Sequence, residues 1–518
     1  MKNKQSIKAF VLITFVILLF LKIDYRFKLD WDCCTDEFDY YSHAKTVALD
    51  FDLNYSNQFE GFEEARFYKN NKSAPYGFFG TGLLSSPFVF IGNFIDNLSV
   101  FNNNYSKSYN YKILFFSFSS IFYFSLGLKM FYIICNKQNY KNNFMIPLLI
   151  FGSGLPYYVF ERYGMSHAFD FFTTTLVIFT SYRLFEKPEK IKYVQLSFSI
   201  LLSLLTRWTN YYVFFIPLFI KYLFFKNKKI TIYKNLYFLL SISFSFLIFL
   251  FHSKLIYGAY TINPNYVYEQ EKIPKFINFF LEQPVYFIFT NFINSFKIIF
   301  SFEFGLFWLS PILFFGILNV FVFLINKKYK LFYLSFIVYL YFFGITLAWG
   351  ETGSSYGYRY ILPLVPLSIL FYINQDKKFI SNIYLIPFSV FSTLSVLFFE
   401  TNEGTQLSTK LVQNTFGNLV YNSQPNYVPE LLSSFANINS FLVVFSTSFL
   451  AVVSFKLISI FIPIPKFVNF LNNLNLPTDN EDFQRLLSNI ETLDFYYFVI
   501  LFLFIYLIYK IIFYKLNN

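Results

Sequence analysis

The amino-acid sequence predicts an all-α polytopic membrane protein, and three observations lead to that prediction. Hydrophobic residues make up 55% of the 518 positions, whereas charged residues make up only 14%. Apolar runs long enough to cross a bilayer recur along the chain. Short lysine clusters lie between these runs, where the positive-inside rule expects them, so the net charge of +12 does not indicate nucleic-acid binding. This composition also excludes a soluble enzyme and a disordered chain.

The first apolar run covers residues 9–23 and follows three lysines. No small-residue cleavage site follows this run, so we expect an uncleaved first span with a cytoplasmic N-terminus. The later spans are expected in a series of apolar segments. They are residues 112–134, 144–160, 168–186, 194–206, 210–225, 236–252, 304–325, 331–349, 359–373, 380–398, 439–462 and 495–514.

Residues 78–95 decide the topology, because this apolar segment contains Pro87 and several glycines. If the segment crosses the membrane, every later lysine cluster changes side. If it lies on the surface, those clusters join the N-terminal lysines inside. The charge bias favours an interfacial or re-entrant helix. We therefore predict a bundle of about 13 transmembrane helices, with the N-terminus inside and the C-terminus outside.

The predicted topology sets the domain organisation. Residues 1–463 should form one transmembrane unit, whose first external loop, residues 24–111, is large and carries juxtamembrane helices. Residues 464–494 should form a cytoplasmic connector, followed by a C-terminal transmembrane helix within residues 495–518. The other external segments would be residues 161–167, 253–303, 350–358 and 399–438.

Three cysteines are too few for a disulfide framework. Cys33 and Cys34 are adjacent, which strains a bridge between them, and Cys135 falls on the other side of the predicted membrane. We expect free thiols.

The densest polar cluster lies just outside the first span. Asp36 and Glu37 fall in the first turn of a predicted helix, where the helix dipole favours acids. Asp36, Asp39, Tyr40 and His43 share one face of that helix through i+3, i+4 and i+7 spacing. Carboxylates near an apolar surface have raised pKa values and can act as general bases. Helix capping on a solvated loop is one alternative, and a divalent metal held by Asp36, Asp39 and His43 is another.

A second polar cluster is expected at the external end of a later span. His167 and Asp170 are one helical turn apart, and ionisable groups at a membrane boundary are costly unless they are paired or functional. The alternative is a snorkelling Arg162 with Ser166 as a helix cap.

A third cluster, residues 349–360, is a glycine-rich external turn that ends in Tyr358 and Arg359. Glycines let backbone N–H groups approach an anion, and an arginine can bind phosphate with two hydrogen bonds. An ordinary tight turn with an interfacial arginine is the alternative. Lys72 and Arg207 are two further external cations that could meet a lipid phosphate or serve as head-group anchors.

Several motifs are absent from the sequence: G-x-x-x-x-G-K-[ST], G-x-G-x-x-G, G-x-S-x-G and H-E-x-x-H. No nucleotide site is therefore visible. Since the polar clusters converge on the predicted external face, group transfer there would need a donor held in the membrane, such as a lipid phosphate.

A first span followed by an external Asp-Glu pair, Asp36-Glu37, and a proline-containing amphipathic segment resembles the GT-C superfamily of integral-membrane glycosyltransferases. The protein O-mannosyltransferase and aminoarabinose transferase-like families belong there. Shorter features look similar too, in order along residues 1–400. They are residues 165–168, 205–207, 304–307 with Ser310-Pro311, and 356–363.

The resemblance implies a GT-C-like bundle and a polyprenyl-phosphate-linked sugar as donor. Asp36 would be the catalytic carboxylate, with Glu37 as its neighbour. Arg359, Lys72 and Arg207 would bind the donor phosphate. The substrate-binding residues would be Asp39, Tyr40, His43, His167, Asp170 and Tyr358. No cofactor is required, although a divalent metal is possible.

The resemblance also implies inverting transfer of a hexosyl or pentosyl group at the external, periplasmic face of the plasma (inner) membrane. A protein, lipid A, teichoic acid or capsule acceptor all remain open. A transporter or flippase of lipid-linked sugars is the main alternative, but it needs ionisable residues at the bilayer midplane, and here they cluster at one face. A polysaccharide polymerase or ligase is a further alternative.

Overall fold

The computed structural model describes most of the chain. The described residues are 12–21, 35–59, 67–69, 72–98, 111–138, 140, 144–226, 235–262, 266–267, 272–302, 305–349, 356–375, 378–403, 410–413, 419–422, 432, 444–445, 448–473, 484, 487–488 and 495–513. Cys33, Cys34 and residues 350–355 of the glycine-rich turn lie outside this part, and so does most of the predicted connector. Cys135 is buried and belongs to no disulfide, as expected.

The described chain is almost entirely helical, which confirms the predicted all-α class. A helix over residues 12–20 comes first. The α-helices that follow are α3 (Thr35–Lys45), α4 (Phe79–Asp96), α6 (Tyr111–Lys137), α7 (Met145–Phe151), α8 (His167–Glu186), α9 (Lys190–Thr206), α10 (Ile216–Phe224), α11 (Leu236–Tyr257), α13 (Lys272–Glu282), α14 (Pro284–Phe300), α15 (Leu306–Leu309), α16 (Pro311–Ile325), α17 (Tyr329–Trp349), α18 (Val365–Ile373), α19 (Lys378–Glu403), α22 (Phe449–Phe461), α23 (Ile464–Asn473) and α25 (Phe495–Phe513).

Short π and 3₁₀ turns interrupt the α-helices. The π turns are η1 (Thr46–Asp50) and η3 (Tyr157–Glu161), and the 3₁₀ turns are η2 (Ser56–Gln58), η4 (Trp208–Phe215) and η6 (Arg359–Leu364). Two antiparallel hairpins complete the described structure. In the first, β1 (Phe67–Lys69) pairs with β2 (Lys72–Ala74); in the second, β3 (Lys410–Gln413) pairs with β4 (Leu419–Asn422).

Most of the helices lie within the predicted apolar segments, but few of them are long, unbroken spans. Among the described residues, three helices are long and apolar enough to cross a membrane: α6, α11 and α17 as far as Ala348. A fourth is possible if α22 and α23 form one bent span. Several predicted spans are instead divided by a π or 3₁₀ turn or by a proline, which shortens each helical piece. The predicted number of about 13 spans is therefore not confirmed.

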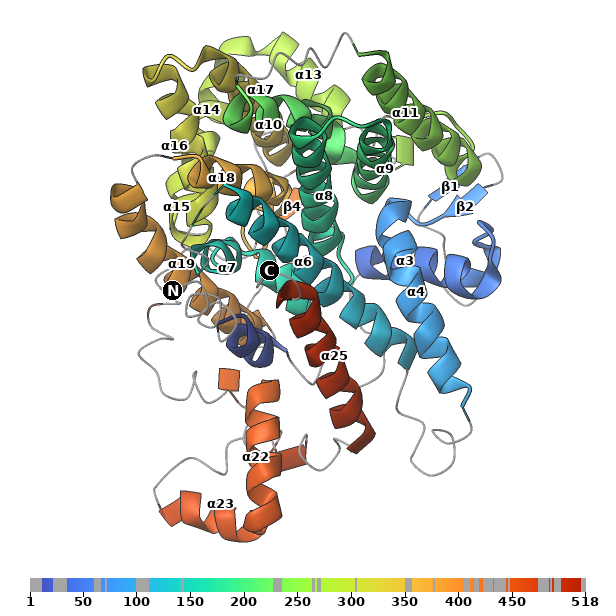
Figure 1. Ribbon diagram of the computed structural model, residues 1–518, viewed down its shortest axis with the longest axis vertical. Helices are drawn as coiled ribbons and strands as arrows, with labels where there is room; N and C mark the ends of the chain where they lie inside the picture. Colours follow the sequence, from blue (N-terminus) through green and yellow to red (C-terminus); the bar gives the residue numbers. More distant parts are fainter. Residues whose placement is uncertain are drawn as a thin grey trace.

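The predicted span at 439–462 corresponds in its described part to helix α22, and a sharp bend follows it. Helix α22 ends at Phe461, Ile462 is extended, and α23 leaves at an angle of 108°. Pro463 explains the break, because a proline lacks the amide donor and excludes the residue before it from helical geometry. Figure 1 shows α22 and α23 extending from one end of the molecule.

Helices α13 and α14 occupy a region where the sequence predicts only an external segment. Pro284 lies in the first turn of α14, where a proline is well tolerated. One face of α14 is exposed and apolar, including Val285, Phe289 and Phe292, while Asn291 and Asn294 are buried.

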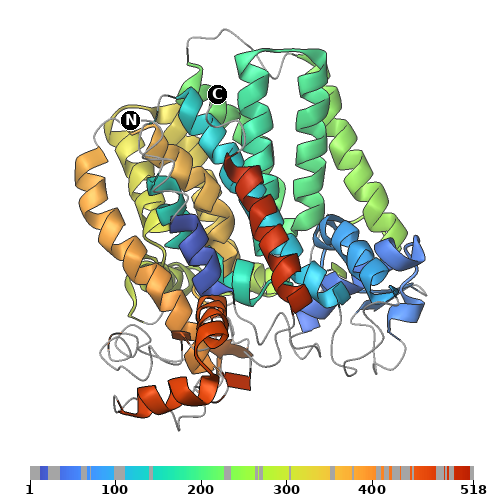
Figure 2. The same cartoon turned by 60° about the horizontal axis from the view of Figure 1, so that its bottom comes forward.

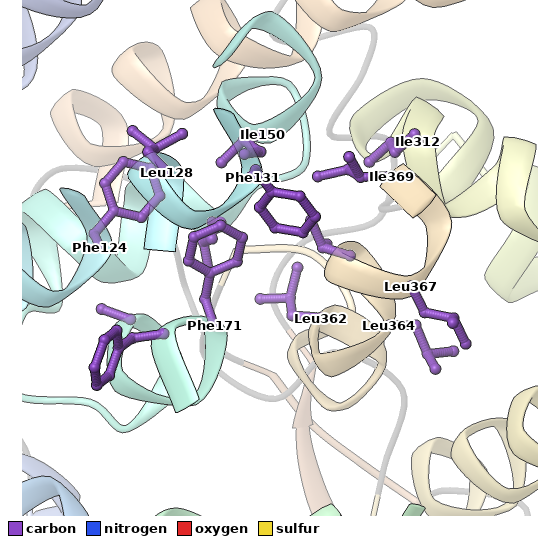
Figure 3. Packing of buried hydrophobic residues seen from close by; sticks show 14 of the residues in the cluster. Phe124, Leu128, Phe131, Ile150, Phe171, Ile312, Leu362, Leu364, Leu367 and Ile369 are labelled. Atoms are coloured by element: carbon purple, nitrogen blue, oxygen red, sulfur yellow. The ribbon is translucent and has the colours of Figure 1, made fainter. Parts of the chain in front are cut away.

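One large apolar core holds the bundle together. Figure 3 shows aromatic and aliphatic side chains from helices far apart in the sequence meeting in this core. Phe124 and Phe131 of α6 lie with Phe171 of α8, and Leu362 and Ile369 approach from η6 and α18. Packing of this kind fixes the ends of the helices, and so the polar residues at those ends.

Helix α4 packs closely against both α3 and α9, and its glycines make this possible. A Cβ on Gly80 would lie 2.6 Å from the backbone of Leu205, near the end of α9. A Cβ on Gly82 would lie 2.2 Å from His43 Cβ on α3. Figure 2 shows α3 and α4 together at one end of the upright helices. The close packing connects the first polar cluster with the region that precedes Arg207.

Candidate functional site

Helix α3 carries the predicted acidic cluster and presents its members to different surroundings. Asp36 and Glu37 occupy the first turn, as predicted. The side chain of Asp36 keeps 39% of its surface exposed, whereas that of Glu37 keeps 4%. The two neighbouring acids therefore lie in different surroundings.

Glu37 forms an ion pair with Arg162. Arg162 Nε donates to Glu37 Oε1 at 3.0 Å, and a Cβ on Gly164 would come within 2.8 Å of Glu37 Cβ. Arg162 follows the π turn η3, which ends at Glu161. The alternative reading of a snorkelling arginine with a capping serine is wrong, because Arg162 pairs with a buried acid and the Ser166 side chain makes no cap hydrogen bond to α8.

Asp36 lies beside Arg359. Arg359 Nη1 is 4.0 Å from Asp36 Oδ2, and the arginine side chain keeps 22% of its surface exposed. Arg359 begins η6, just after Gly357, whose φ of +64° favours glycine. Arg359 Nη2 also donates to the hydroxyl of Tyr360 at 3.2 Å. An acid and an arginine from distant parts of the sequence thus meet with both groups still accessible.

Tyr40 lies close to the acids of α3 and to Arg207. Its hydroxyl hydrogen-bonds with Ser166, and Asp36, Asp39 and Arg207 are all close enough to act on it electrostatically. Burial raises the pKa of Tyr40 to about 12, so the hydroxyl keeps its proton at neutral pH. Tyr40 thereby connects α3 to the start of α8.

His167 and Asp170, on the first turn of α8, form a buried network with Arg207. Arg207 Nη1 lies 2.8 Å from His167 Nδ1 and 3.5 Å from Asp170 Oδ2. Asn210 Nδ2 donates to Asp170 Oδ1 at 2.7 Å, and Thr174 Oγ1 donates to the same oxygen at 3.4 Å. In this network Asp170 and Arg207 contact each other, and each also contacts a neighbouring polar side chain.

The remaining predicted residues lie in different places. His43 faces Tyr55 and Gly77, because its Nε2 donates to Gly77 O at 2.6 Å and its Nδ1 accepts from the Tyr55 hydroxyl at 2.6 Å. Burial lowers the pKa of His43 to about 4. Asp39, which is 1% exposed, acts electrostatically on Tyr40. Lys72 is exposed in the β1–β2 hairpin, and within the described residues it does not join the pair of Asp36 and Arg359.

Tyr358 is buried immediately before Arg359.

The three arginines of the site share one structural feature. Arg162 follows the π turn η3, Arg207 precedes the 3₁₀ turn η4, and Arg359 begins the 3₁₀ turn η6. Such turns free backbone groups from the regular helical ladder and are frequent at functional sites. The sequence suggests Arg207 and Arg359 as site residues but treats Arg162 as an anchor, because nothing local shows that its partner is Glu37.

A metal on Asp36, Asp39 and His43 is not supported by the arrangement of the described side chains. Both ring nitrogens of His43 are occupied by Tyr55 and Gly77. Within the described residues, no group of three or more His, Cys, Asp or Glu side chains could hold a metal ion.

Comparison with protein-family models, with curated proteins and with solved structures finds no match to this chain.

Proposed function

We propose that the chain is a membrane glycosyltransferase that moves a sugar from a polyprenyl-phosphate donor to an acceptor at the external face of the plasma (inner) membrane. The accessible pair of Asp36 and Arg359 is the observation that carries this proposal. The pair provides a base and a phosphate-binding cation 4.0 Å apart. Both keep enough exposed surface to exchange their mutual contact for contacts with a substrate.

The proposed reaction is a single displacement. Asp36 takes the proton of an acceptor hydroxyl or amine, whose oxygen or nitrogen forms the new bond to the anomeric carbon. The bond from that carbon to the phosphate oxygen breaks, and the polyprenyl phosphate leaves with the electron pair. Arg359 stabilises the negative charge that develops on the phosphate. Attack from the opposite side inverts the anomeric carbon.

The neighbouring residues fit supporting roles in this reaction. The Glu37–Arg162 ion pair ties α3 to the segment that leads into α8, so it would hold Asp36 in place. The protonated hydroxyl of Tyr40 is a hydrogen-bond donor suited to a sugar hydroxyl. The mechanism requires no metal.

Sugar transfer in membranes that contain this chain tests the proposal. A panel of radiolabelled polyprenyl-phosphate sugars is supplied to membranes expressing the wild type or Asp36→Asn. We expect incorporation by the wild type from one donor, and a rate lower by about 10² to 10⁴ in the variant, which is the usual worth of general-base catalysis. Inversion is checked by the anomeric configuration of the product.

Asp52→Asn is the matched control, because Asp52 is exposed and its Oδ1 accepts from the amide of Asn54, a contact that asparagine preserves. This control should transfer at the wild-type rate. Equal rates for Asp36→Asn and the wild type would remove Asp36 as the base. A folded wild type without transfer from any donor would contradict the proposal and favour a flippase, which a lipid-flipping assay would then measure.

A further inference from the structure

His167 offers one inference beyond the assignment of the base and the phosphate-binding arginine. Its imidazole is 4% exposed and lies against the ring of Tyr158, with 4.1 Å between ring centres. The Tyr158 hydroxyl in turn donates to the backbone oxygen of Tyr356 at 3.0 Å. The plane of the imidazole is therefore held by an aromatic ring that is itself anchored to the segment before Arg359.

The contact with Arg207 fixes where the proton of this imidazole lies. A guanidinium has only donors, so the 2.8 Å contact requires Nδ1 of His167 to be the acceptor. An imidazole with an unprotonated Nδ1 is neutral and carries its proton on Nε2. Protonation of Nδ1 would place two donors face to face, next to the positive charge of Arg207.

The Asp170 network keeps Arg207 in this position. Asp170 Oδ2 lies 3.5 Å from Arg207 Nη1, and Asn210 and Thr174 hold the other carboxylate oxygen. Arg207 is 7% exposed and is occupied by Asp170 and His167. This arrangement gives the arginine a buried counter-charge and a fixed direction.

The other ring nitrogen of His167, Nε2, differs from Nδ1 in its hydrogen bonding. Of the residues that the structure describes, none supplies a hydrogen-bond partner to Nε2 of His167. Arg359 lies close enough to His167 to act on it electrostatically. Ser166, the residue before His167, contacts Tyr40, which lies beside Asp36. The ring therefore lies close to the residues around Asp36 and Arg359.

We propose that Arg207 is a positioning residue that holds His167 as a neutral imidazole with its proton on Nε2, so that His167 serves the site as a hydrogen-bond donor and not as a base. Its ligand is an oxygen acceptor on the substrate. In the context of the proposed function, on which this last step rests, that acceptor is a sugar hydroxyl or a non-bridging phosphate oxygen of the donor lipid. Asp36 is then the proton acceptor of the site.

Nitrogen-15 NMR of the full chain, labelled at histidine and reconstituted in a membrane mimetic, tests the inference without any activity assay. The chain has three histidines, so the signals lost in His167→Gln identify those of His167. We expect one unprotonated nitrogen and one protonated nitrogen, assigned to Nδ1 and Nε2, with no titration between about pH 5 and about pH 8. A His167 that titrates in this range, or that carries its proton on Nδ1, would overturn the inference.

Two arginine variants separate positioning from folding. Arg207→Lys keeps a donor next to Nδ1 and should keep the Nε2–H form. Arg207→Leu removes the donor, so His167 should either titrate or populate both neutral forms. Unchanged His167 signals in folded Arg207→Leu would contradict the role given to Arg207. If that variant does not fold, the double variant Arg207→Leu/Asp170→Asn, which removes the donor without leaving a buried unpaired charge, provides the same comparison.

Transfer assays then test the donor role. His167→Gln retains an N–H near the Nε2 position and should keep most of the rate, whereas His167→Leu should lose about 10- to 100-fold, as expected for one hydrogen bond to a polar or charged group. Equal rates for these two variants would contradict the donor role. Absence of transfer in the wild type would instead count against the proposed function, while the NMR result would stand independently.

Discussion

The site contains two aspartate–arginine pairs that differ in burial and in the partners around them. Asp170 and Arg207 lie 3.5 Å apart and keep 2% and 9% of their side-chain surface exposed. Asp36 and Arg359 lie 4.0 Å apart and keep 39% and 22% exposed. The buried pair is surrounded by Asn210, which donates to Asp170, and by His167, which accepts from Arg207. Both members of the more exposed pair keep part of their side-chain surface accessible.

The comparison shows that residue type alone does not define a role. A buried ion pair has already lost its water, so separating its members leaves a charge without solvent and is costly. An exposed pair is screened by solvent and contributes little to stability, so it can open for a substrate at low cost. The same two side-chain types thus serve as a structural support in one place and as a candidate for chemistry in the other.

Removing Asp170 should have the largest effect on stability. We expect Asp170→Ala to lower the free energy of unfolding by about 3 to 5 kcal/mol, because Arg207 would remain buried without its counter-charge. Thermal and denaturant unfolding of the protein in detergent measures the loss. Glu186→Ala is the matched control, since Glu186 pairs with Lys137 at an exposed site and should cost less than about 1 kcal/mol. Similar losses for both variants would contradict the distinction between the two kinds of pair.

Removing Arg359 should lower the rate of sugar transfer and leave the free energy of unfolding almost unchanged. In Arg359→Gln, sugar transfer should fall by about 10² to 10³, the usual effect of losing one group that stabilises transition-state charge. The free energy of unfolding should change by less than about 1 kcal/mol, because the pair with Asp36 is partly exposed. Initial rates and unfolding curves are compared with those of Arg183→Gln, an exposed arginine in the last turn of α8. An activity loss that merely follows loss of folded protein would refute the catalytic role.

The sequence singles out most of the residues in these two pairs, but it does not show which residue pairs with which. Apolar periodicity locates the helices, and acids or cations at their ends identify Asp36, Asp170, Arg207 and Arg359. The pairing of Asp170 with Arg207 depends on how α8 packs against the end of α9, which no local pattern contains. For the same reason, Arg162 cannot be recognised from its neighbours as the partner of a buried acid.

His43 illustrates the limit of helical spacing. The i+7 spacing from Asp36 correctly places both residues on one helix, but it says nothing about what each turn of that helix packs against. The second half of α3 meets Tyr55 and Gly77, so the imidazole becomes part of the support for the helix. The sequence analysis also leaves α13 and α14 undetected, because the predicted topology assigns residues 253–303 as a whole to an external segment.

The buried side of α3 should make stability depend on pH. His43 is neutral in the folded protein, where burial lowers its pKa from 6.5 to about 4. The unfolded chain therefore binds one more proton between these values, and the stability contributed by neutral His43 is lost as the pH falls from 6.5 to about 4. The free energy of unfolding should fall by about 3 kcal/mol over this interval.

Unfolding of the wild type and of His43→Leu at several pH values measures this effect. The variant is expected to be less stable at neutral pH, because it lacks the contacts with Tyr55 and Gly77. It should nevertheless show a smaller loss of stability over the same interval, since it lacks the group that titrates. Parallel curves for the two proteins would mean that His43 has the same pKa in the folded and unfolded chain.

The smallest of these effects concerns the contact that fixes α3 on α4. In Gly82→Ala the new Cβ would lie 2.2 Å from His43 Cβ, so α3 must shift, and the free energy of unfolding should fall by about 1 to 3 kcal/mol. Gly344→Ala, within α17, is the matched control, because nothing lies within 4 Å of its added Cβ. Its free energy of unfolding should rise by about 0.5 to 1 kcal/mol. A shift of α3 would also move Asp36 relative to Arg359. Transfer in the folded fraction of Gly82→Ala should therefore fall as well, whereas a change in stability with an unchanged rate would show that the exposed pair tolerates movement of its helix.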